Sequence, residues 1–172
     1  GDHWGLGRRA SCGPSLRVLR DFQRTLQVVD QVVGVLQSDR QADGARADAG
    51  ARNTMIFTDL GVITTTPLNG PALTRTMLTE LSAGRPDVIV FELGDGILGA
   101  YGVEAILSAP DIAKSLSAVV LSANDPVAAW GGVKLLRERF SIEPCAVTGP
   151  ATDNAVGVDI IEQQMQVRAF NA

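Results

Sequence analysis

The sequence predicts an α/β protein: a mostly parallel sheet of about four or five strands, covered by helices on both faces and accompanied by a long N-terminal amphipathic helix. From residue 54 onward, short apolar runs alternate with helical patterns, and such alternation requires crossover connections and therefore parallel strands. Three of these runs lack the period of two that a half-solvated strand shows, which is typical of strands buried on both faces. The 172 residues, with 45% hydrophobic side chains, suffice for the core of such a domain.

Composition and charge exclude several classes of protein. The formal net charge of −4 argues against a general nucleic-acid binder, and no apolar run approaches the roughly 18 residues of a membrane span. The two cysteines, Cys12 and Cys145, are far apart, and His3 is the single histidine, so a zinc site is not expected. Cys145 lies in a predicted buried strand and is expected to be an inert core residue. We therefore expect a cytoplasmic protein.

Residues 1–52 differ in composition from residues 53–172 and are treated as a separate N-terminal arm. They contain eight Arg and six Asp but no Glu or Lys. A genuine basic arm, a gene fragment and an opening read from a shifted frame all remain open. Apolar residues recur at helical spacing over about 24 residues after Pro14, in the segment 14–37. This predicts an amphipathic helix that either packs on a core or forms a dimer.

The strands and helices of residues 53–172 are expected in strict alternation. Helix boundaries are suggested by Pro71 and Gly84, by Asp111, and by Thr152 or Asp153 as the cap of the last helix. Strands are expected at 55–58, 88–91, 118–122 and 145–147, and helices at about 71–83, 103–108, from 111, at about 126–140 and up to about 165.

Polar and acidic residues gather at or just beyond the ends of the expected strands. In parallel sheets covered by helices, ligands bind outside the carboxyl ends of the strands, so this clustering predicts a ligand site. The residues are Asp59, Glu92, Asp95, Asn124, Asp125, Thr148, Asp153 and Asn154.

Two segments carry a resemblance to a known family. The run 87–96 reads Asp-Val-Ile-Val-Phe-Glu-Leu-Gly-Asp-Gly, and 119–125 reads Val-Val-Leu-Ser-Ala-Asn-Asp. Together they resemble the second half of a P-loop NTPase domain of the dethiobiotin synthetase and cobyric acid synthase type. The likeness covers about residues 45–172 and extends to uncharacterised bacterial proteins that join a P-loop domain to a Rossmann-like one.

This resemblance implies a site for Mg²⁺ and ATP and a small-molecule acid substrate. Asp59 and Glu92 would hold the magnesium ion, a hard cation that favours carboxylate oxygen. Glu92 and Asp95 would be the catalytic residues, and the glycines of 94–102 would let the backbone approach substrate closely. The residues that would contact the cofactor are Gly94, Gly96, Asn124, Asp125, Thr148, Asp153 and Asn154.

The chain departs from the family at the phosphate-binding loop. The motif Gly-x-x-x-x-Gly-Lys-Ser/Thr, whose amides and lysine cradle phosphates, is absent. The loop was lost, lies upstream of Gly1, or is replaced because the fold binds something else. Mg-dependent phosphoryl transfer or ATP-dependent ligation is thus one hypothesis. The alternatives are a non-catalytic degenerate nucleotide-binding or assembly module, with a homodimer or a further N-terminal domain as partner, and a Rossmann-like NAD-binding domain.

Several of these residues also have a purely structural interpretation. Glu92 could form a salt bridge with an arginine, Asp95 could shape a turn, and Asp125 before Pro126 is more typical of a helix cap than of a ligand contact. The polar segment 148–154 fits either an anion site at a helix start or simple capping. Gly131-Gly132 in a helical pattern suggests close packing on the sheet or on a partner.

Overall fold

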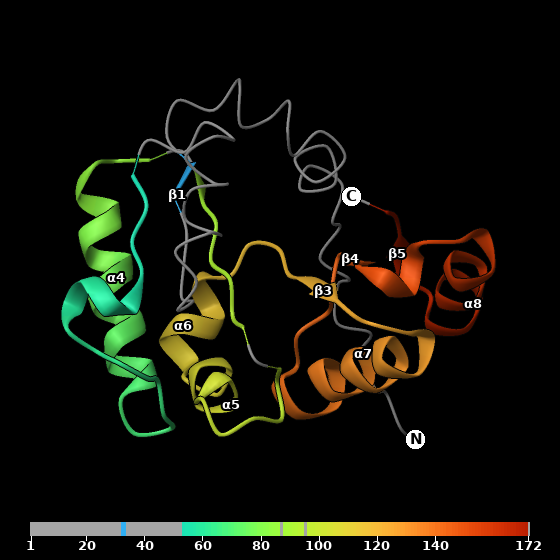
Figure 1. Cartoon of the computed structure of the whole chain (residues 1–172), viewed down its shortest axis with the longest axis horizontal. Helices are drawn as coiled ribbons and strands as arrows, with labels where there is room; N and C mark the ends of the chain where they lie inside the picture. Colours follow the sequence, from blue (N-terminus) through green and yellow to red (C-terminus); the bar gives the residue numbers. More distant parts are fainter. Residues whose placement is uncertain (1–31, 34–52, 87, 95, 172) are drawn as a thin grey trace, which may run out of the picture.

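The computed structural model describes residues 32–33, 53–86, 88–94 and 96–171, which form a mixed α/β fold. Two regions lie side by side in Figure 1. The helical region, residues 53–116, contains α4, α5 and α6. The sheet region, residues 117–171, contains β3, β4 and β5 with α7 and α8.

The helical region is built around α4 (Gly70–Ala83), with η1 (Phe57–Leu60), α5 (Val103–Leu107) and α6 (Pro110–Ser115). Pro71 lies in the first turn of α4, where its missing N–H leaves no bond unmade, and Gly84 follows the last turn. The helix therefore has the boundaries that the sequence predicts. Its buried face packs in a cluster whose members are Phe57, Leu73, Met77, Ile106, Ala109 and Ile112.

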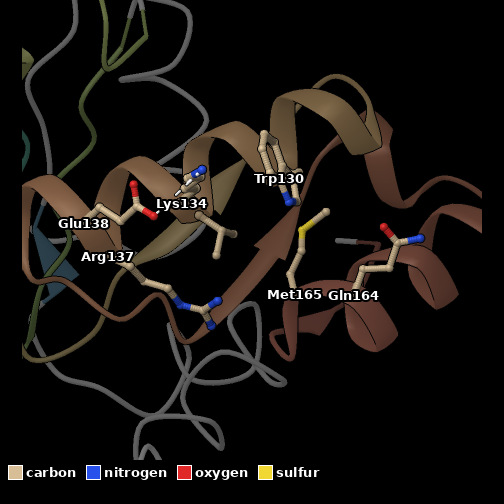
Figure 2. Close-up of a pocket in the computed structure, with 7 residues that line it drawn as sticks. Trp130, Lys134, Arg137, Glu138, Gln164 and Met165 are labelled. Carbon is tan, nitrogen blue, oxygen red and sulfur yellow. Dashed lines mark ion pairs between the residues drawn. The ribbon is translucent and has the colours of Figure 1, made fainter.

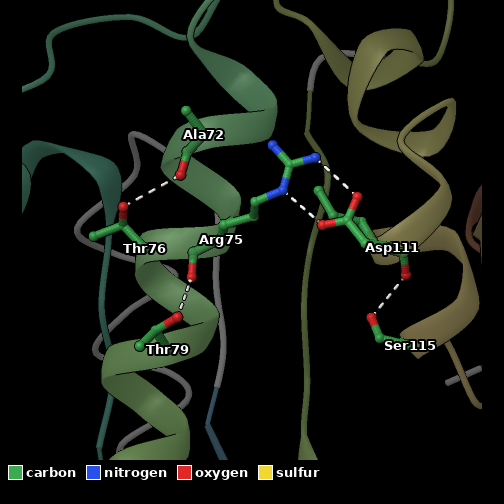
Figure 3. Close-up of polar contacts among 7 residues, drawn as sticks. Ala72, Arg75, Thr76, Thr79, Asp111 and Ser115 are labelled. Carbon is green, nitrogen blue, oxygen red and sulfur yellow. Dashed lines mark hydrogen bonds and ion pairs between the residues drawn. The ribbon is translucent and has the colours of Figure 1, made fainter.

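An ion pair joins α4 to α6 on the surface of the helical region (Figure 3). Arg75 donates from Nε to Asp111 Oδ2 at 2.6 Å and from Nη2 to Asp111 Oδ1 at 2.8 Å. These hydrogen bonds lower the pKa of the Asp111 carboxyl to about 2. The two-bond geometry holds the guanidinium and the carboxylate in one mutual orientation.

The sheet region repeats a strand and a helix in order. β3 (Val120–Ser122), β4 (Ala146–Thr148) and β5 (Arg168–Ala169) form a three-stranded parallel sheet in the order β3-β4-β5. The connections are α7 (Pro126–Phe140), then η2 (Pro150–Thr152) with α8 (Ala155–Met165). Because both crossovers run in the same direction along the sheet, right-handed connections place α7 and α8 on the same face, where they pack against each other.

The core of the sheet region lies between this face and the two helices. Val147 of β4 and Ile161 of α8 are fully buried, and Val133 of α7 is nearly so. The cluster comprises Ala123, Ala129, Val133, Val147, Ala151, Ile161, Met165 and Val167. A further cluster joins the two regions, because Val103 and Leu107 of α5 pack with Leu136 of α7. Arg139 of α7 also pairs with Glu104 of α5.

The strand expected at 55–58 is wrong. Residues 57–60 form the single turn η1, in which Asp59 Oδ2 accepts a hydrogen bond from the Ile56 amide at 3.0 Å. Gly61, at φ +74°, ends that turn. Local capping by an aspartate and a left-handed glycine thus outweighs the strand preference of the apolar run.

The expectation of one sheet of four or five strands is only partly met. The described residues form two separate parallel sheets, the second a pair of β1 (Val32–Val33) with β2 (Val88–Ile89). After Ile89 the chain leaves the ladder, and Phe91 and Leu93 pack against the α4 cluster instead.

The long helix expected within residues 14–37 is wrong at Val32 and Val33, which form β1. β-Branched residues favour extended backbone, and these two valines pair with Val88 and Ile89 of β2. The rest of that segment lies outside the described residues. Cys145 is buried, as expected of a core residue.

Candidate functional site

The carboxyl ends of β3 and β4 lie side by side, because Ser122 pairs in register with Thr148. Asn124 and Asp125 follow β3 and are exposed, whereas Thr148 is half-buried. Asp153 and Asn154, both exposed, follow η2. The sheet region therefore brings five of the expected residues to one edge, and we call this edge, with the starts of α7 and α8, the carboxyl edge.

The loop after β4 is fixed to the strand beside it. The Ala123 amide donates to the Thr148 carbonyl, and the Ala151 amide donates to the Ala123 carbonyl, each at 2.9 Å. Gly149 has φ +91°, and a Cβ on it would lie 2.7 Å from Ser122 Oγ. Only glycine allows this close approach of the two strand ends.

A buried hydroxyl holds the same loop to the end of the chain's last strand. Thr152 is 2% exposed, and its Oγ1 lies 2.8 Å from the Gly149 carbonyl oxygen and 3.0 Å from that of Phe170. The backbone between Gly149 and Asn154 is therefore held in place before any ligand arrives, which lowers the entropic cost of binding there.

The backbone amides at the start of α7 are already hydrogen-bonded within the helix cap. Asp125 Oδ1 accepts hydrogen bonds from the amides of Val127 at 2.7 Å and Ala128 at 2.9 Å. Ala129 N–H donates to the Asp125 carbonyl, and Pro126 has no N–H. Each backbone N–H of the first turn is thus engaged, which confirms the cap interpretation of Asp125 and leaves no amide there for a ligand.

The start of α8 is different. Asn154 Oδ1 accepts only from the Gly157 amide, at 2.9 Å, so Asn154 is the cap and the expected cap at Thr152 or Asp153 is wrong. Among the hydrogen bonds of the described residues, none uses the amides of Ala155 and Val156. Both residues are exposed. These two amides, at the positive end of an 11-residue helix, are suited to an anion.

The residues expected to hold magnesium lie in the helical region. Asp59 already accepts the Ile56 amide within η1, and Glu92, which is exposed, follows β2. In the described part of the chain no three or more His, Cys, Asp or Glu side chains come together as a metal site would require. Because magnesium takes as few as one or two protein carboxylates, the pair Asp59 and Glu92 stays a prediction.

The glycine loop expected to contact substrate is only partly described. Gly94 is half-buried, Gly96 is exposed with φ +81°, and Asp95 lies outside the described residues. Gly102, at φ +85°, has a packing reason, because a Cβ there would lie 2.4 Å from the Thr66 carbonyl oxygen. This glycine joins the start of α5 to the loop before α4.

A shallow groove runs between α7 and α8, away from the carboxyl edge. It has a volume of about 270 Å³. Figure 2 shows Trp130 of α7 beside Met165 of α8, with Lys134 and Glu138 further along α7. Lys134 Nζ lies 5.1 Å from the centre of the Trp130 ring and 3.9 Å from Glu138 Oε1. None of the residues expected to form the ligand site lines this groove.

Comparison with models of protein families, with curated proteins and with solved structures finds no match. No helix in the described ranges is long and apolar enough to cross a membrane. Sequence reasoning predicted an anion site or simple capping at the helix start that follows segment 148–154, but it did not identify Ala155 and Val156 as the residues whose backbone amides are open. Recognising Asn154 rather than Asp153 as the cap would have located them, since capping fixes which amides remain open.

Proposed function

We propose that residues 53–172 bind a phosphate-bearing small molecule, a nucleotide, at the carboxyl edge. The observation that carries this proposal is the pair of open amides at the start of α8, beside the paired ends of β3 and β4. In parallel α/β sheets this edge is where ligands bind. A phosphate there gains two backbone N–H donors and the helix dipole.

The side chains around these amides suit a polar ligand that brings a bound cation with it. Asn124 offers both donor and acceptor groups, and the Thr148 hydroxyl lies at the end of β4. The Asp153 carboxylate is exposed beside the same helix start and would repel a bare phosphate. Magnesium carried by the phosphates would offset that repulsion, and Asp153 would then contact its water shell.

The resemblance to the second half of P-loop NTPase domains supports a nucleotide over other anions. Glu92 is the residue through which we extend the proposal to Mg-dependent phosphoryl transfer or ligation of an acid, since it follows β2 and is exposed. We assign Glu92 the role of holding magnesium. Glu92→Gln tests that role, because it keeps the shape of the side chain but removes the charge that would hold the ion.

A thermal-shift titration with ATP, GTP, ADP and NAD, each with and without Mg²⁺, tests the proposal. A ligand at about 100 times its Kd adds roughly 2.7 kcal/mol of stability, which raises Tm by roughly 5–10 °C for a chain of this length. We expect ATP or GTP with Mg²⁺ to produce such a shift. A cooperative melt that none of the four nucleotides moves contradicts the proposal.

The variant Ala155→Pro locates the site. Proline is favoured at the first helical position, and Asn154, at φ −139° and ψ 158°, has the extended backbone that a residue before proline adopts. The substitution removes one open amide and leaves α8 folded. We expect it to abolish most of the nucleotide-dependent shift, whereas Ala155→Ser, which keeps the amide, preserves it. Equal shifts in both variants would place the ligand elsewhere.

A further inference from the structure

The loop before α4 contains an asparagine that is followed directly by glycine. Asn69 precedes Gly70, and no other asparagine of the sequence has glycine as its next residue. At such a step the backbone nitrogen of the glycine can attack the side-chain amide of the asparagine, because glycine has no Cβ to obstruct the approach. The product is a five-membered imide, which water opens to an acid. Asn69 is half-buried and Gly70 is buried, so the surrounding fold affects this reaction.

Hydrogen bonds engage each of the three reacting groups. The attacking nitrogen of Gly70 donates to the Thr66 carbonyl at 2.8 Å, and the leaving nitrogen, Asn69 Nδ2, donates to the Thr64 carbonyl at 3.2 Å. Asn69 Oδ1 accepts from the Thr66 amide at 2.6 Å and from Thr66 Oγ1 at 3.1 Å. Thr66 Oγ1 also accepts from the Asn69 amide, at 3.3 Å. Because the attack requires these groups to be released, residues 64–70, which we call the 64–70 turn, must open first.

We propose that Asn69 is a modification site, at which spontaneous deamidation proceeds only when the 64–70 turn opens. In the open turn Gly70 N forms a bond to Asn69 Cγ, and the bond from Cγ to Nδ2 breaks. Nδ2 leaves as ammonia and takes up the proton of the Gly70 amide. Water then adds across one of the two imide C–N bonds, which leaves aspartate or isoaspartate at position 69.

The product does not fit the closed turn. A carboxylate in place of the amide has no hydrogen to donate to the Thr64 carbonyl, and isoaspartate adds a carbon atom to the main chain before Gly70. The turn has little room to shift toward α5, since a Cβ on Gly102 would lie 2.4 Å from the Thr66 carbonyl oxygen. Deamidation therefore converts a transient opening into a lasting one. It does so in the helical region, independently of the proposed nucleotide site.

Peptide mass spectrometry of the full chain, incubated in mildly alkaline buffer, measures the rate of deamidation. The reaction replaces NH2 by OH, and fragmentation of the peptide assigns the mass gain to position 69. Because a group that reacts only in an open state reacts in proportion to the population of that state, we expect the native rate to be at least about tenfold below the rate in guanidinium chloride. In the denaturant Asn69 should react faster than Asn154, which precedes alanine. Equal native and denatured rates, or a slower reaction at Asn69 than at Asn154 in the denaturant, overturn the proposal.

Thr66→Val tests the role of the turn. It removes the hydroxyl that bonds Asn69 at two atoms, and the loss of one hydrogen bond raises the open population by about fivefold. We expect the native rate to rise by that factor or more, with the rate in guanidinium chloride unchanged and Tm measured to show that the chain stays folded. Thr65→Val, which removes a neighbouring hydroxyl that makes none of these bonds, should leave both rates unchanged. A native rate in Thr66→Val that does not exceed the rate in Thr65→Val overturns the proposal.

Discussion

The helical and sheet regions differ in how their helices and strands are connected. In the sheet region each helix follows a strand through a short capped turn, and the Asp125 and Asn154 caps fix where α7 and α8 begin. In the helical region long irregular segments connect the elements, and two aliphatic side chains, Ile63 at 91% and Leu68 at 95%, are almost fully exposed. Regular crossovers leave polar groups at one shared edge, which is why the proposed ligand site lies in the sheet region.

The largest expected effect tests whether the sheet region has a tightly packed core. Ile161 is fully buried among α7, β4 and α8 residues, and we expect Ile161→Ala to lower the free energy of unfolding by about 2–5 kcal/mol. Urea unfolding followed by circular dichroism measures this. Val156→Ala, on the exposed side of the same helix, should change it by less than about 0.5 kcal/mol. Similar losses for the two variants would show that α8 is not packed as described.

The next effect concerns the cap that closes α7. Asp125→Ala frees the amides of Val127 and Ala128, and we expect a loss of about 1 kcal/mol in the free energy of unfolding. Asp125→Asn retains an acceptor oxygen at the same place, so its loss should be much smaller. Equal losses would mean that the charge of Asp125, rather than its hydrogen bonds, stabilises the helix.

A pH titration probes the surface pair of the helical region. The pKa of Asp111 is lowered to about 2 from an unfolded value of about 3.9, so its contribution to stability is present above pH 4. That contribution is lost as the pH falls from about 4 to about 2, because protonation breaks the pairing with Arg75. Both side chains are about half exposed, so the effect is small. Thermal melts of Asp111→Asn should show a weaker acid dependence than wild type; identical pH profiles would contradict this role.

A further comparison contrasts two buried threonines. Thr74 in α4 is fully buried, and within the described structure its Oγ1 has no hydrogen-bond partner. We expect Thr74→Val to leave the free energy of unfolding unchanged or to raise it slightly. Thr152→Val removes the bonds to the Gly149 and Phe170 carbonyls and should lower it by about 1 kcal/mol. Chemical denaturation measures the free energy of unfolding of both variants. A larger loss in Thr74→Val than in Thr152→Val would contradict these hydrogen-bonding roles.

Sequence patterns predict the helices well where a residue type determines a boundary. Pro71, Gly84 and Pro126 mark the ends of α4 and the start of α7 where the structure has them. The strand expected at 55–58 is wrong because Asp59 captures a backbone amide, an interaction that apolar periodicity does not report. β5, with two residues, is too short to produce any pattern.

The candidate site is predictable only in outline. Strand-end polar residues predict a cluster at one edge of the sheet, and five of them lie at the edge where the ends of β3 and β4 pair. Which groups remain open to a ligand depends on how each cap uses its oxygens: Asp125 occupies two amides, whereas Asn154 occupies one. The open groups are backbone amides, so the sequence locates them only when Asn154 is recognised as the cap.

An NMR titration of the ¹⁵N-labelled chain with ATP and Mg²⁺ tests the central claim most directly. We predict that the largest amide shifts occur at Ala155 and Val156, with smaller shifts at Asn124 and Thr148, and that the amides of Val127 and Ala128 move little because Asp125 already holds them. Saturable shifts centred on other residues, or no saturable shifts at millimolar ATP, would contradict a nucleotide site at the carboxyl edge.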